Sequence, residues 1–519
     1  MSTRLFRRAA LGVLACALAA SAQNVADLEK RITEFTLPNG LHFIVLERHT
    51  APVFAGLSYV NAGAANDPAG KAGIAHMFEH MAFKGTPSIG SKNYAAEKLS
   101  LDALEKTYDL LEEERRKGPR ADKARVEKLQ ADVKSGIDQT FAQVDQDAFT
   151  RMVEENGAVG LNAGTSMDST VYFMSLPANR LEMWFMLESD RFISPVFREF
   201  YKERGVVRNE YAQRIESDPQ GQLVTALMNT AFADSPYHVG YAGIPSDIEN
   251  LRVGDALAFR KTYYVPSNIT IVVAGDVDPQ EVRALATKHF GPMPAGPLPP
   301  PVITKEQEQR GEKRVSIETD SQPMMAIGYK RPDALDADDP VFDVISGVLS
   351  QGRTGRMYKE LVEEKKLALG AAAYATFPGG KQDNLYILFM VPNSGKTIDE
   401  LEKATYEIIE RLKKEPVDDA TLKRVKINVR AGLIRALNSN MGMANALAAA
   451  HVGYGSWKKL YSALDDLEKV SAADVQRVAQ KYFIARGRTV AYMSKATPTA
   501  TSASTAAANP VSGSSQESK

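Results

Sequence analysis

Short apolar runs separated by turn residues predict paired strands near the start of the chain. Residues 33–37 and 41–47 flank Pro38-Asn39-Gly40, a turn sequence that favours a hairpin, and a third strand is expected over residues 53–60. Farther along, apolar residues recur at the three- to four-residue spacing of amphipathic helices. Hairpins followed by helices predict an α+β sandwich with a largely antiparallel sheet.

The pattern of the first half returns in the second half. At an offset of 219 residues, several polar residues of one half meet identical residues of the other: Asp247, Glu249, Asp255 and Tyr263 pair with Asp466, Glu468, Asp474 and Tyr482. Each half closes with a helix pattern and then a strand, at residues 269–273 and 489–492. Residues 291–304 are rich in Pro and predict a stiff extended linker. We therefore expect two duplicated α/β sandwich domains, residues 30–290 and 305–493; a chance match between amphipathic helices is the alternative.

Both ends of the chain depart from this pattern. Three arginines precede an apolar run over residues 9–20, and Ala20-Ser21-Ala22 follows as a small-residue cleavage site. This order predicts a signal peptide over residues 1–22, cleaved after Ala22, and an exported protein that is periplasmic or secreted. The run is too short for a transmembrane anchor, and a lipid anchor at Cys16 would leave a very short apolar region. Residues 494–519, rich in Ala, Ser and Thr, are expected to form a disordered tail.

A strongly charged segment over about residues 97–145 interrupts the first half. Apolar residues stand at helical spacing on both sides of Gly118-Pro119, which predicts a helical hairpin inserted into the domain. The hairpin could serve as a lid or as a contact with a partner, and an inserted surface element without a function is equally compatible with the pattern.

Composition narrows the chemistry. The chain has 63 Lys and Arg against 64 Asp and Glu, so it lacks the basic excess that a nucleic acid partner requires. Its single cysteine excludes a disulfide framework and metal sites made of several thiolates. A metal ion would have to be held by carboxylates and by some of the seven histidines.

Two of those histidines stand in the motif His76-Met77-Phe78-Glu79-His80. Side chains at positions i, i+3 and i+4 of a helix share one face, so His76, Glu79 and His80 converge. Two imidazoles at this spacing can both reach one zinc ion. The neighbours are apolar almost all round the helix, which predicts a buried helix in which ionisable groups require partners or a metal. Two satisfied core histidines beside an incidental glutamate are the alternative.

The motif and its surroundings resemble the M16 family of zinc metallopeptidases, which includes pitrilysin, insulysin and the mitochondrial processing peptidase. The resemblance rests on residues 75–86 and extends through residues 37–41, 161–166 and 203–210, so that it covers most of the chain from about residue 32 to 493. It implies the M16 fold, one Zn²⁺ per chain and hydrolysis of unfolded or short peptides. His76 and His80 would be zinc ligands, and Glu79 would be the general base that takes a proton from the attacking water.

The resemblance also suggests the remaining site residues. The family's third zinc ligand is a later glutamate; its usual distance from the motif would select Glu154 or Glu155, whereas the context of residues 204–210 selects Glu210, which we choose. Glu203 lies two helical turns before Glu210 and corresponds to a supporting acid that orients or tunes the site. Asn162 and Ala163 resemble the edge strand to which an extended peptide substrate adds.

The second half lacks the metal motif. An approximate match places Asp343, Ser346 and Gly347 opposite the three motif residues, and the offset of 219 places Val429 opposite Glu210. The resemblance implies a half-size member that pairs with an identical subunit or with a homologue lacking zinc, and the family's Arg and Tyr that assist the transition state cannot be placed in this sequence. The alternatives are a non-hydrolytic M16-like structural subunit of an envelope complex and a peptide-binding or chaperone protein.

Overall fold

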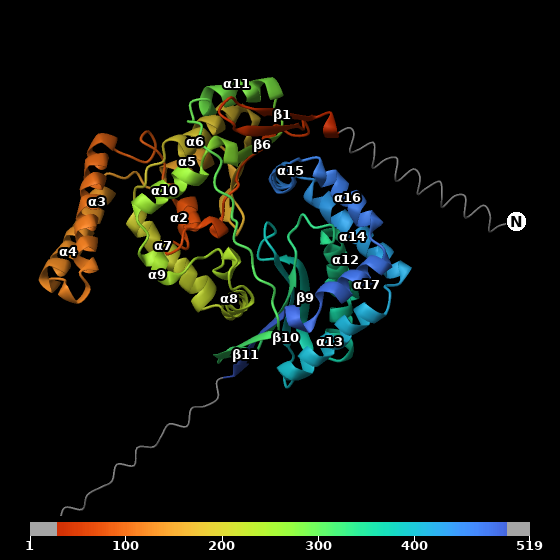
Figure 1. Cartoon of the computed structure of the whole chain (residues 1–519). Coiled ribbons are helices and arrows are strands. Elements are labelled where there is room, and N and C mark those ends of the chain that lie inside the picture. The colour runs from red at the N-terminus through yellow and green to blue at the C-terminus, as the bar shows by residue number, and fades with distance from the viewer. Residues whose placement is uncertain (1–27, 496–519) are drawn as a thin grey trace, which may run out of the picture.

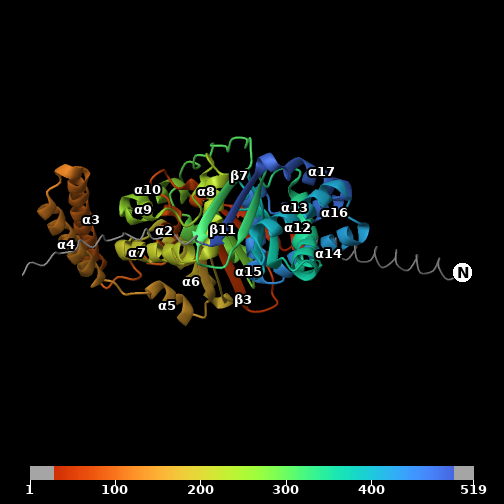
Figure 2. The ribbon, with the colours of Figure 1, turned by 90° about the horizontal axis from the view of Figure 1, so that it is seen from below.

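Two separate sheets, one from each half of the chain, organise the structure, a computed structural model that describes residues 28–495 (Figures 1 and 2). The predicted signal peptide over residues 1–22 and residues 496–519 of the predicted tail lie outside the described residues. The first two residues of that tail, 494 and 495, instead end a strand over Arg488–Lys495. No helix within residues 28–495 combines the length and the apolar character that crossing a bilayer requires.

The first sheet has six strands in the order β1-β2-β6-β3-β5-β4. In chain order the strands are β1 (Ile32–Thr36), β2 (His42–Glu47), β3 (Val53–Val60), β4 (Val159–Thr165), β5 (Thr170–Pro177) and β6 (Ile269–Gly275). Only β2 and β6 run parallel. The turn between β1 and β2 uses Gly40 at φ 97°, a backbone conformation that glycine adopts without strain. The predicted hairpin and third strand are therefore present.

The second sheet has five strands in the order β7-β11-β8-β10-β9. They are β7 (Lys313–Thr319), β8 (Met325–Arg331), β9 (Ala368–Phe377), β10 (Asn384–Pro392) and β11 (Arg488–Lys495). Only β7 and β11 run parallel, so the sheet repeats the order β2-β6-β3-β5-β4 strand for strand. The predicted class, two duplicated sandwiches with largely antiparallel sheets, is confirmed.

Each sheet carries helices of its own half on one face, because alternate strand residues point to that face. The first half contributes α2 (Ile74–Met81), α5 (Ala148–Glu155), α6 (Leu181–Ile193), α7 (Phe200–Tyr211), α9 (Pro245–Glu249), α10 (Val253–Tyr263) and α11 (Pro279–Phe290). The second contributes α12 (Asp339–Ser350), α13 (Ile398–Lys414), α14 (Asp419–Ala436), α16 (Lys459–Lys469) and α17 (Ala472–Tyr482). The offset of 219 carries the first residue of α7, α10 and β6 onto the first residue of α14, α17 and β11.

The opposite face of each sheet is covered by a helix from the other half. Helix α15 (Asn440–Tyr454) packs Leu447 and its neighbours against Ile44 and Val272 of the first sheet. In return, α8 (Pro219–Ala231) packs Leu227 and its neighbours against the second sheet. Figure 1 shows α15 beside β6 although it is coloured as part of the second half. The two halves thus complete each other's cores.

The charged segment forms α3 (Tyr94–Arg116) and α4 (Lys123–Phe141), which pack together around a small apolar core of their own and project from the first half (Figure 2). At the base of this hairpin, Glu97 forms a fully buried ion pair with Arg198. Arg198 also donates hydrogen bonds to the backbone carbonyls of Lys84, Thr86 and Ile89, just after α2. The hairpin is therefore anchored to the segment that follows the motif helix.

The connection between the halves is longer than the predicted linker. Residues 294–312 contain neither helix nor strand. Its later part is held in place: the Glu306 carboxylate accepts hydrogen bonds from the backbone N–H groups of residues 233–235, and Gln309 donates to Arg488 O. Hydrogen bonds to a carboxylate are stronger than those between neutral groups, so these three contacts hold the segment against the first half.

Candidate metal centre

The motif helix α2 begins at a defined turn. Gly73, at φ 99°, precedes the helix, and the Asp67 carboxylate accepts hydrogen bonds from the N–H groups of Gly73 at 2.6 Å and Ala75 at 3.1 Å. These N–H groups have no acceptor within the helix, and the negative carboxylate also interacts favourably with the positive end of the helix dipole. The start of the helix, and with it the direction of His76 and His80, is thereby fixed.

Helices α2 and α7 bring three metal-binding atoms together. His76 Nε2 and His80 Nε2 are 3.3 Å apart, and Glu210 Oε2 lies 3.4 Å from His80 Nε2 and 3.7 Å from His76 Nε2. Ligand atoms about 2.0–2.1 Å from a tetrahedral zinc ion stand roughly 3.3–3.4 Å from one another. Two imidazole nitrogens and one carboxylate oxygen at these separations fit zinc, and the set leaves a fourth position open.

Acidic and basic neighbours orient the three groups. Glu203, also on α7, accepts a hydrogen bond from His80 Nδ1 at 2.9 Å and contacts Lys84 Nζ at 2.6 Å. A proton on His80 Nδ1 leaves the lone pair of Nε2 free to bind a metal. Glu210 turns one oxygen to the histidines while the other contacts Arg214 at 2.9 Å. Two of the three candidate ligands, His80 and Glu210, are therefore oriented by residues outside the set, whereas His76 Nδ1 makes no hydrogen bond.

The electrostatics of the metal-free site follow from these contacts. Burial and the neighbouring His80 lower the pKa of His76 to about 4. Burial also disfavours the charged form of His80, but its hydrogen bonds to Glu203 and Glu210 outweigh burial and raise its pKa to about 9. For Glu203, burial is outweighed by His80 and Lys84, and its pKa falls to about 2. Zinc binding at this site would compete with protonation of His80.

Glu79 stands apart from the three candidate ligands. Its Oε2 accepts a hydrogen bond from the Thr165 hydroxyl, at the end of β4, at 2.6 Å. Burial raises the pKa of Glu79, although the Thr165 hydrogen bond acts in the opposite direction. The Glu79 carboxylate is therefore held by Thr165 within the cavity that His76, His80 and Glu210 also line.

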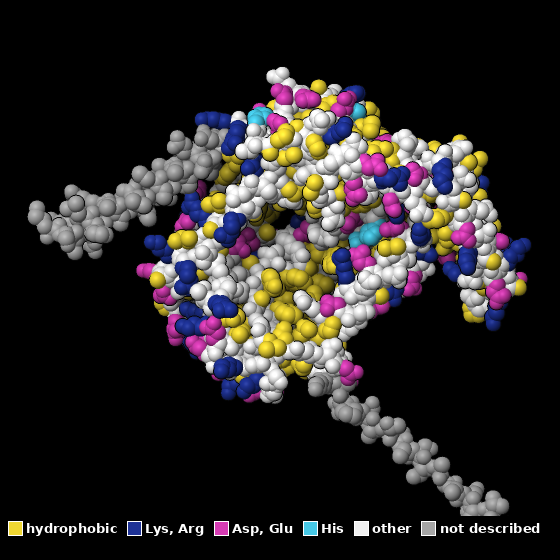
Figure 3. All heavy atoms as spheres, turned by 180° about the vertical axis from the view of Figure 1, so that it is seen from behind, with side chains coloured by type: hydrophobic (Ala, Val, Ile, Leu, Met, Phe, Trp, Pro, Cys, Tyr) yellow, Lys and Arg dark blue, Asp and Glu magenta, His cyan; other side chains and the backbone are white. Residues whose placement is uncertain are grey.

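A cavity of about 430 Å³ joins these groups to the edge of the first sheet. It is lined by the five ionisable residues of the centre, by Asn162, Ala163, Gly164 and Thr165 of β4, and by Arg214 and Tyr241, among others. Strand β4 has only one neighbour, so one of its edges is open. A larger and more apolar cavity of about 760 Å³ shares Thr165, Arg214 and Tyr241 with it. Figure 3 shows that the molecule is hollowed between its halves.

The structure distinguishes between the glutamates that the sequence offered as the third metal ligand. Glu210 lies beside both histidines, whereas Glu154 and Glu155 are exposed near the end of α5. Sequence reasoning did not single out Arg214 or Tyr241. Arg214 follows Glu210 by one helical turn, which is a usable signal, but the chain position of Tyr241 gives none.

Comparison with known proteins places this geometry in a family. The sequence matches "Insulinase (Peptidase family M16)" over residues 44–103 and 139–242, and "Peptidase M16 inactive domain" over residues 250–429. The chain belongs to the M16 peptidase family. The interruption between residues 103 and 139 of the first match falls within the α3–α4 hairpin.

Several M16 relatives span nearly the whole chain. "Zinc protease PqqE" of Helicobacter pylori is 28% identical over 480 residues, which cover 91% of this chain and 94% of the relative. A probable mitochondrial-processing peptidase subunit beta of Arabidopsis thaliana is 22% identical over 88% of this chain and 76% of its own length. The crystal structure of a protease from Helicobacter pylori superposes with a TM-score of 0.74 at 26% identity, covering 89% of this chain and 99% of that one.

The second M16 domain has packing where the first has ligands. On α12, a Cβ atom at Gly347 would lie 2.3 Å from Val425 of α14, so the two helices meet too closely for a larger side chain. The Ser346 hydroxyl donates to Tyr386, and Val429, the counterpart of Glu210, packs against the apolar core. Among the described residues, α12 and α14 assemble no set of metal-binding groups.

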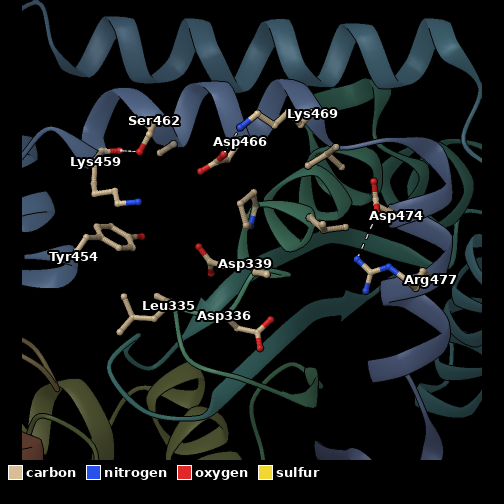
Figure 4. A pocket seen from close by; sticks show the side chains of 16 residues that line it. Leu335, Asp336, Asp339, Tyr454, Lys459, Ser462, Asp466, Lys469, Asp474 and Arg477 are labelled. Carbon is tan, nitrogen blue, oxygen red and sulfur yellow. Dashed lines mark hydrogen bonds and ion pairs between the residues drawn. The ribbon is translucent and has the colours of Figure 1, made fainter.

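A cavity of about 500 Å³ lies on the second M16 domain, away from the centre (Figure 4). Several carboxylates line it, but Asp466 is paired with Lys469 at 2.9 Å and Asp474 with Arg477 at 3.5 Å. Asp339 contacts Arg331, and Asp336 accepts a hydrogen bond from the backbone N–H of Asp338, so these carboxylates have partners within the same half.

Proposed function

We propose that this protein is a zinc-dependent endopeptidase that hydrolyses unfolded or short peptides. The observation that carries the proposal is the triangle of His76, His80 and Glu210, whose ligand atoms are 3.3–3.7 Å apart, with Glu79 beside it and outside the ligand set. One Zn²⁺ per chain is held by the three ligands; when bound, it polarises the scissile carbonyl and lowers the pKa of water.

The chain's own residues supply the proton transfers. Glu79 takes a proton from the attacking water and passes it to the leaving amine. Thr165 holds the Glu79 carboxylate in place through its hydroxyl. Glu203 keeps His80 in the tautomer that leaves Nε2 free, because it accepts from Nδ1.

The open edge of β4 is the proposed substrate platform. Asn162 and Ala163 line the cavity that contains Glu79, and an extended peptide that adds to this edge through backbone hydrogen bonds passes the metal centre. Because such pairing requires an extended backbone, unfolded and short peptides are selected over folded proteins. The predicted signal peptide adds that the protein acts in the periplasm or outside the cell.

A paired assembly is part of the proposal. The chain supplies two M16 domains, and a second subunit, identical or homologous and without zinc, closes the space around the substrate. A protein of the same fold without hydrolysis, acting as a structural or peptide-binding subunit, is the competing function, and retention of all three ligands together with Glu79 argues against it.

The test is Glu79→Gln, measured by zinc content and by digestion of an unfolded peptide. We expect the same zinc content as in the wild type and a loss of hydrolysis of about 10²–10⁴-fold, the usual contribution of a general base. The matched control is Glu154→Gln, an exposed glutamate of the same domain, which should retain both zinc and activity.

Two outcomes would overturn the proposal. Full activity in Glu79→Gln removes the assigned base. An inactive wild-type chain that binds zinc, and that stays inactive at concentrations that drive self-association and with a zinc-free homologue added, favours the non-hydrolytic alternative. Inhibition of the wild type by a chelator, reversed by zinc, supports the metal's role.

A further inference from the structure

We propose that Glu34, His42 and His451 form a second metal site, which takes a divalent transition-metal ion such as Zn²⁺ at the junction between the two halves. One donor comes from each of β1, β2 and α15, and their ligand atoms all lie within 4.8 Å of one another. The donor set, two imidazoles and one carboxylate, has the same composition as the centre on α2 and α7.

The histidines meet across the junction, not along one helix. The rings of His42 and His451 lie face to face, with centroids 4.1 Å apart and planes at 5°. Four of the chain's seven histidines therefore lie in two contacting pairs, His76 with His80 edge-on and His42 with His451 stacked, and the stacked pair joins residues from opposite ends of the chain. No motif in the sequence indicates this meeting, because it depends on α15 crossing to the first sheet.

One nitrogen of each of the two histidine rings makes no hydrogen bond. His42 Nε2 and His451 Nδ1 are both inaccessible to solvent and make no hydrogen bond. A buried nitrogen without a hydrogen bond is unfavourable, and a metal ion is one of the few partners that satisfies two of them at once. Glu34 Oε2 lies 3.7 Å from His42 Nε2 and completes the set.

Neighbouring side chains orient two of the three donors. The Thr36 hydroxyl is 3.0 Å from His42 Nδ1, which leaves Nε2 as the nitrogen available to a metal. The indole N–H of Trp457 donates to Glu34 Oε2 at 3.0 Å. Supporting hydrogen bonds of this kind accompany metal ligands in proteins.

Binding requires one ring to turn. In parallel rings the lone pairs also run parallel, so a single ion cannot lie in both ring planes. Rotation of the His451 ring about its Cβ–Cγ bond directs Nδ1 toward His42 Nε2, and this nitrogen has no hydrogen bond to break.

A bound ion would join the halves through coordination bonds to its ligands. Strands β1 and β2 belong to the first sheet, whereas α15 comes from the second half and covers that sheet. An ion that binds the folded chain and not the separated elements stabilises their docking by mass action. The site is therefore structural, and its occupancy does not depend on peptide hydrolysis.

The experiment counts zinc by mass spectrometry after saturation and desalting, and follows thermal unfolding with and without added zinc. We expect two equivalents for the wild type and one each for His451→Ala and for His80→Ala. The zinc-dependent rise in Tm should shrink in His451→Ala. His49→Ala is the matched control, since His49 is an exposed histidine paired with Asp276, and it should keep two equivalents.

Glu34→Gln provides a second variant if His451→Ala fails to fold, because it keeps the side-chain shape while weakening the ligand. We expect its second equivalent to bind at least tenfold more weakly. One equivalent in the wild type, lost completely in His80→Ala, would overturn the second site. Two equivalents in both His451→Ala and Glu34→Gln would overturn the ligand assignment.

Discussion

The two halves share one topology and differ in what fills the space between two corresponding helices. In the first half, α2 and α7 face each other through His76, His80, Glu203 and Glu210. In the second, the offset of 219 replaces the two glutamates by Leu422 and Val429, and α12 meets α14 at Gly347. Buried ionisable groups are unfavourable unless they are paired or bind a metal, whereas apolar packing is stable by itself. The fold therefore accommodates the centre without requiring it.

A second comparison concerns what the halves share. Helices α8 and α15 occupy corresponding places in the repeat, and each covers the sheet of the other half. Neither sheet has a complete core without its partner. The two halves thus repeat one topology and depend on each other for their cores, although they differ at the centre.

The largest expected effect comes from replacing candidate ligands of the first half by the residues found at the corresponding positions of the second half. His80→Gly combined with Glu210→Val should fold, abolish zinc binding at this centre and reduce peptide hydrolysis by at least about 10³-fold, because the metal supplies several kcal/mol of transition-state stabilisation. Zinc content, hydrolysis and circular dichroism measure the three effects. Hydrolysis at more than a tenth of the wild-type rate would show that the centre is not the catalytic one.

Because α8 and α15 each cover the sheet of the other half, truncating a core residue of either helix should lower the stability of the whole protein by a similar amount. Leu447→Ala and Leu227→Ala each remove a fully buried leucine of an exchanged helix, and each should lower the free energy of unfolding by about 2–5 kcal/mol. Urea unfolding should show one cooperative transition in both variants. Leu257→Ala is the control, since Leu257 is 47% exposed and should cost less than about 1 kcal/mol. Two separate transitions would show that the halves fold independently.

A substitution at Glu203 tests how much the zinc affinity of the first half depends on residues outside the proposed ligand set. Glu203→Gln removes the charge that holds His80, so zinc should bind about 10–100-fold more weakly while the fold remains intact. Zinc competition against a chelator of known affinity measures the change. Glu155→Gln, exposed on α5, should leave zinc affinity unchanged. An unaltered affinity in Glu203→Gln would restrict that residue to a packing role.

Local patterns in the sequence were sufficient to predict the motif helix, the first hairpin and the repeat of the two halves. The helical spacing of His76 and His80, the hairpin at Gly40 and the repeat at an offset of 219 are short-range or periodic signals, and the structure contains each element. Glu210 required the resemblance to the M16 family, because spacing alone pointed to Glu154 or Glu155. The structure brings Glu210, and neither of the others, to the histidines.

Contacts between segments that are far apart in the chain could not be predicted from local patterns in the sequence. The crossing of α8 and α15, the meeting of His42 with His451 and the approach of Tyr241 to the centre all depend on tertiary packing. A helix that covers another half's sheet has the same apolar periodicity as one that covers its own. Periodicity predicts that a face is buried and does not predict what covers it.

The smallest expected effect concerns Thr165, in the β4–β5 hairpin that borders the metal centre. Thr165 pairs with Thr170 at the end of β4 and β5, whereas Phe377 and Leu385 occupy the corresponding end in the second half. Thr165→Val keeps the shape but removes the hydrogen bond to Glu79, so hydrolysis should fall about tenfold at unchanged zinc content. Thr165→Ser retains the hydroxyl and should restore most of the rate. Equal rates in the two variants would mean that Glu79 is positioned by α2 alone, and that the hydroxyl is one more difference between the halves without a part in the chemistry.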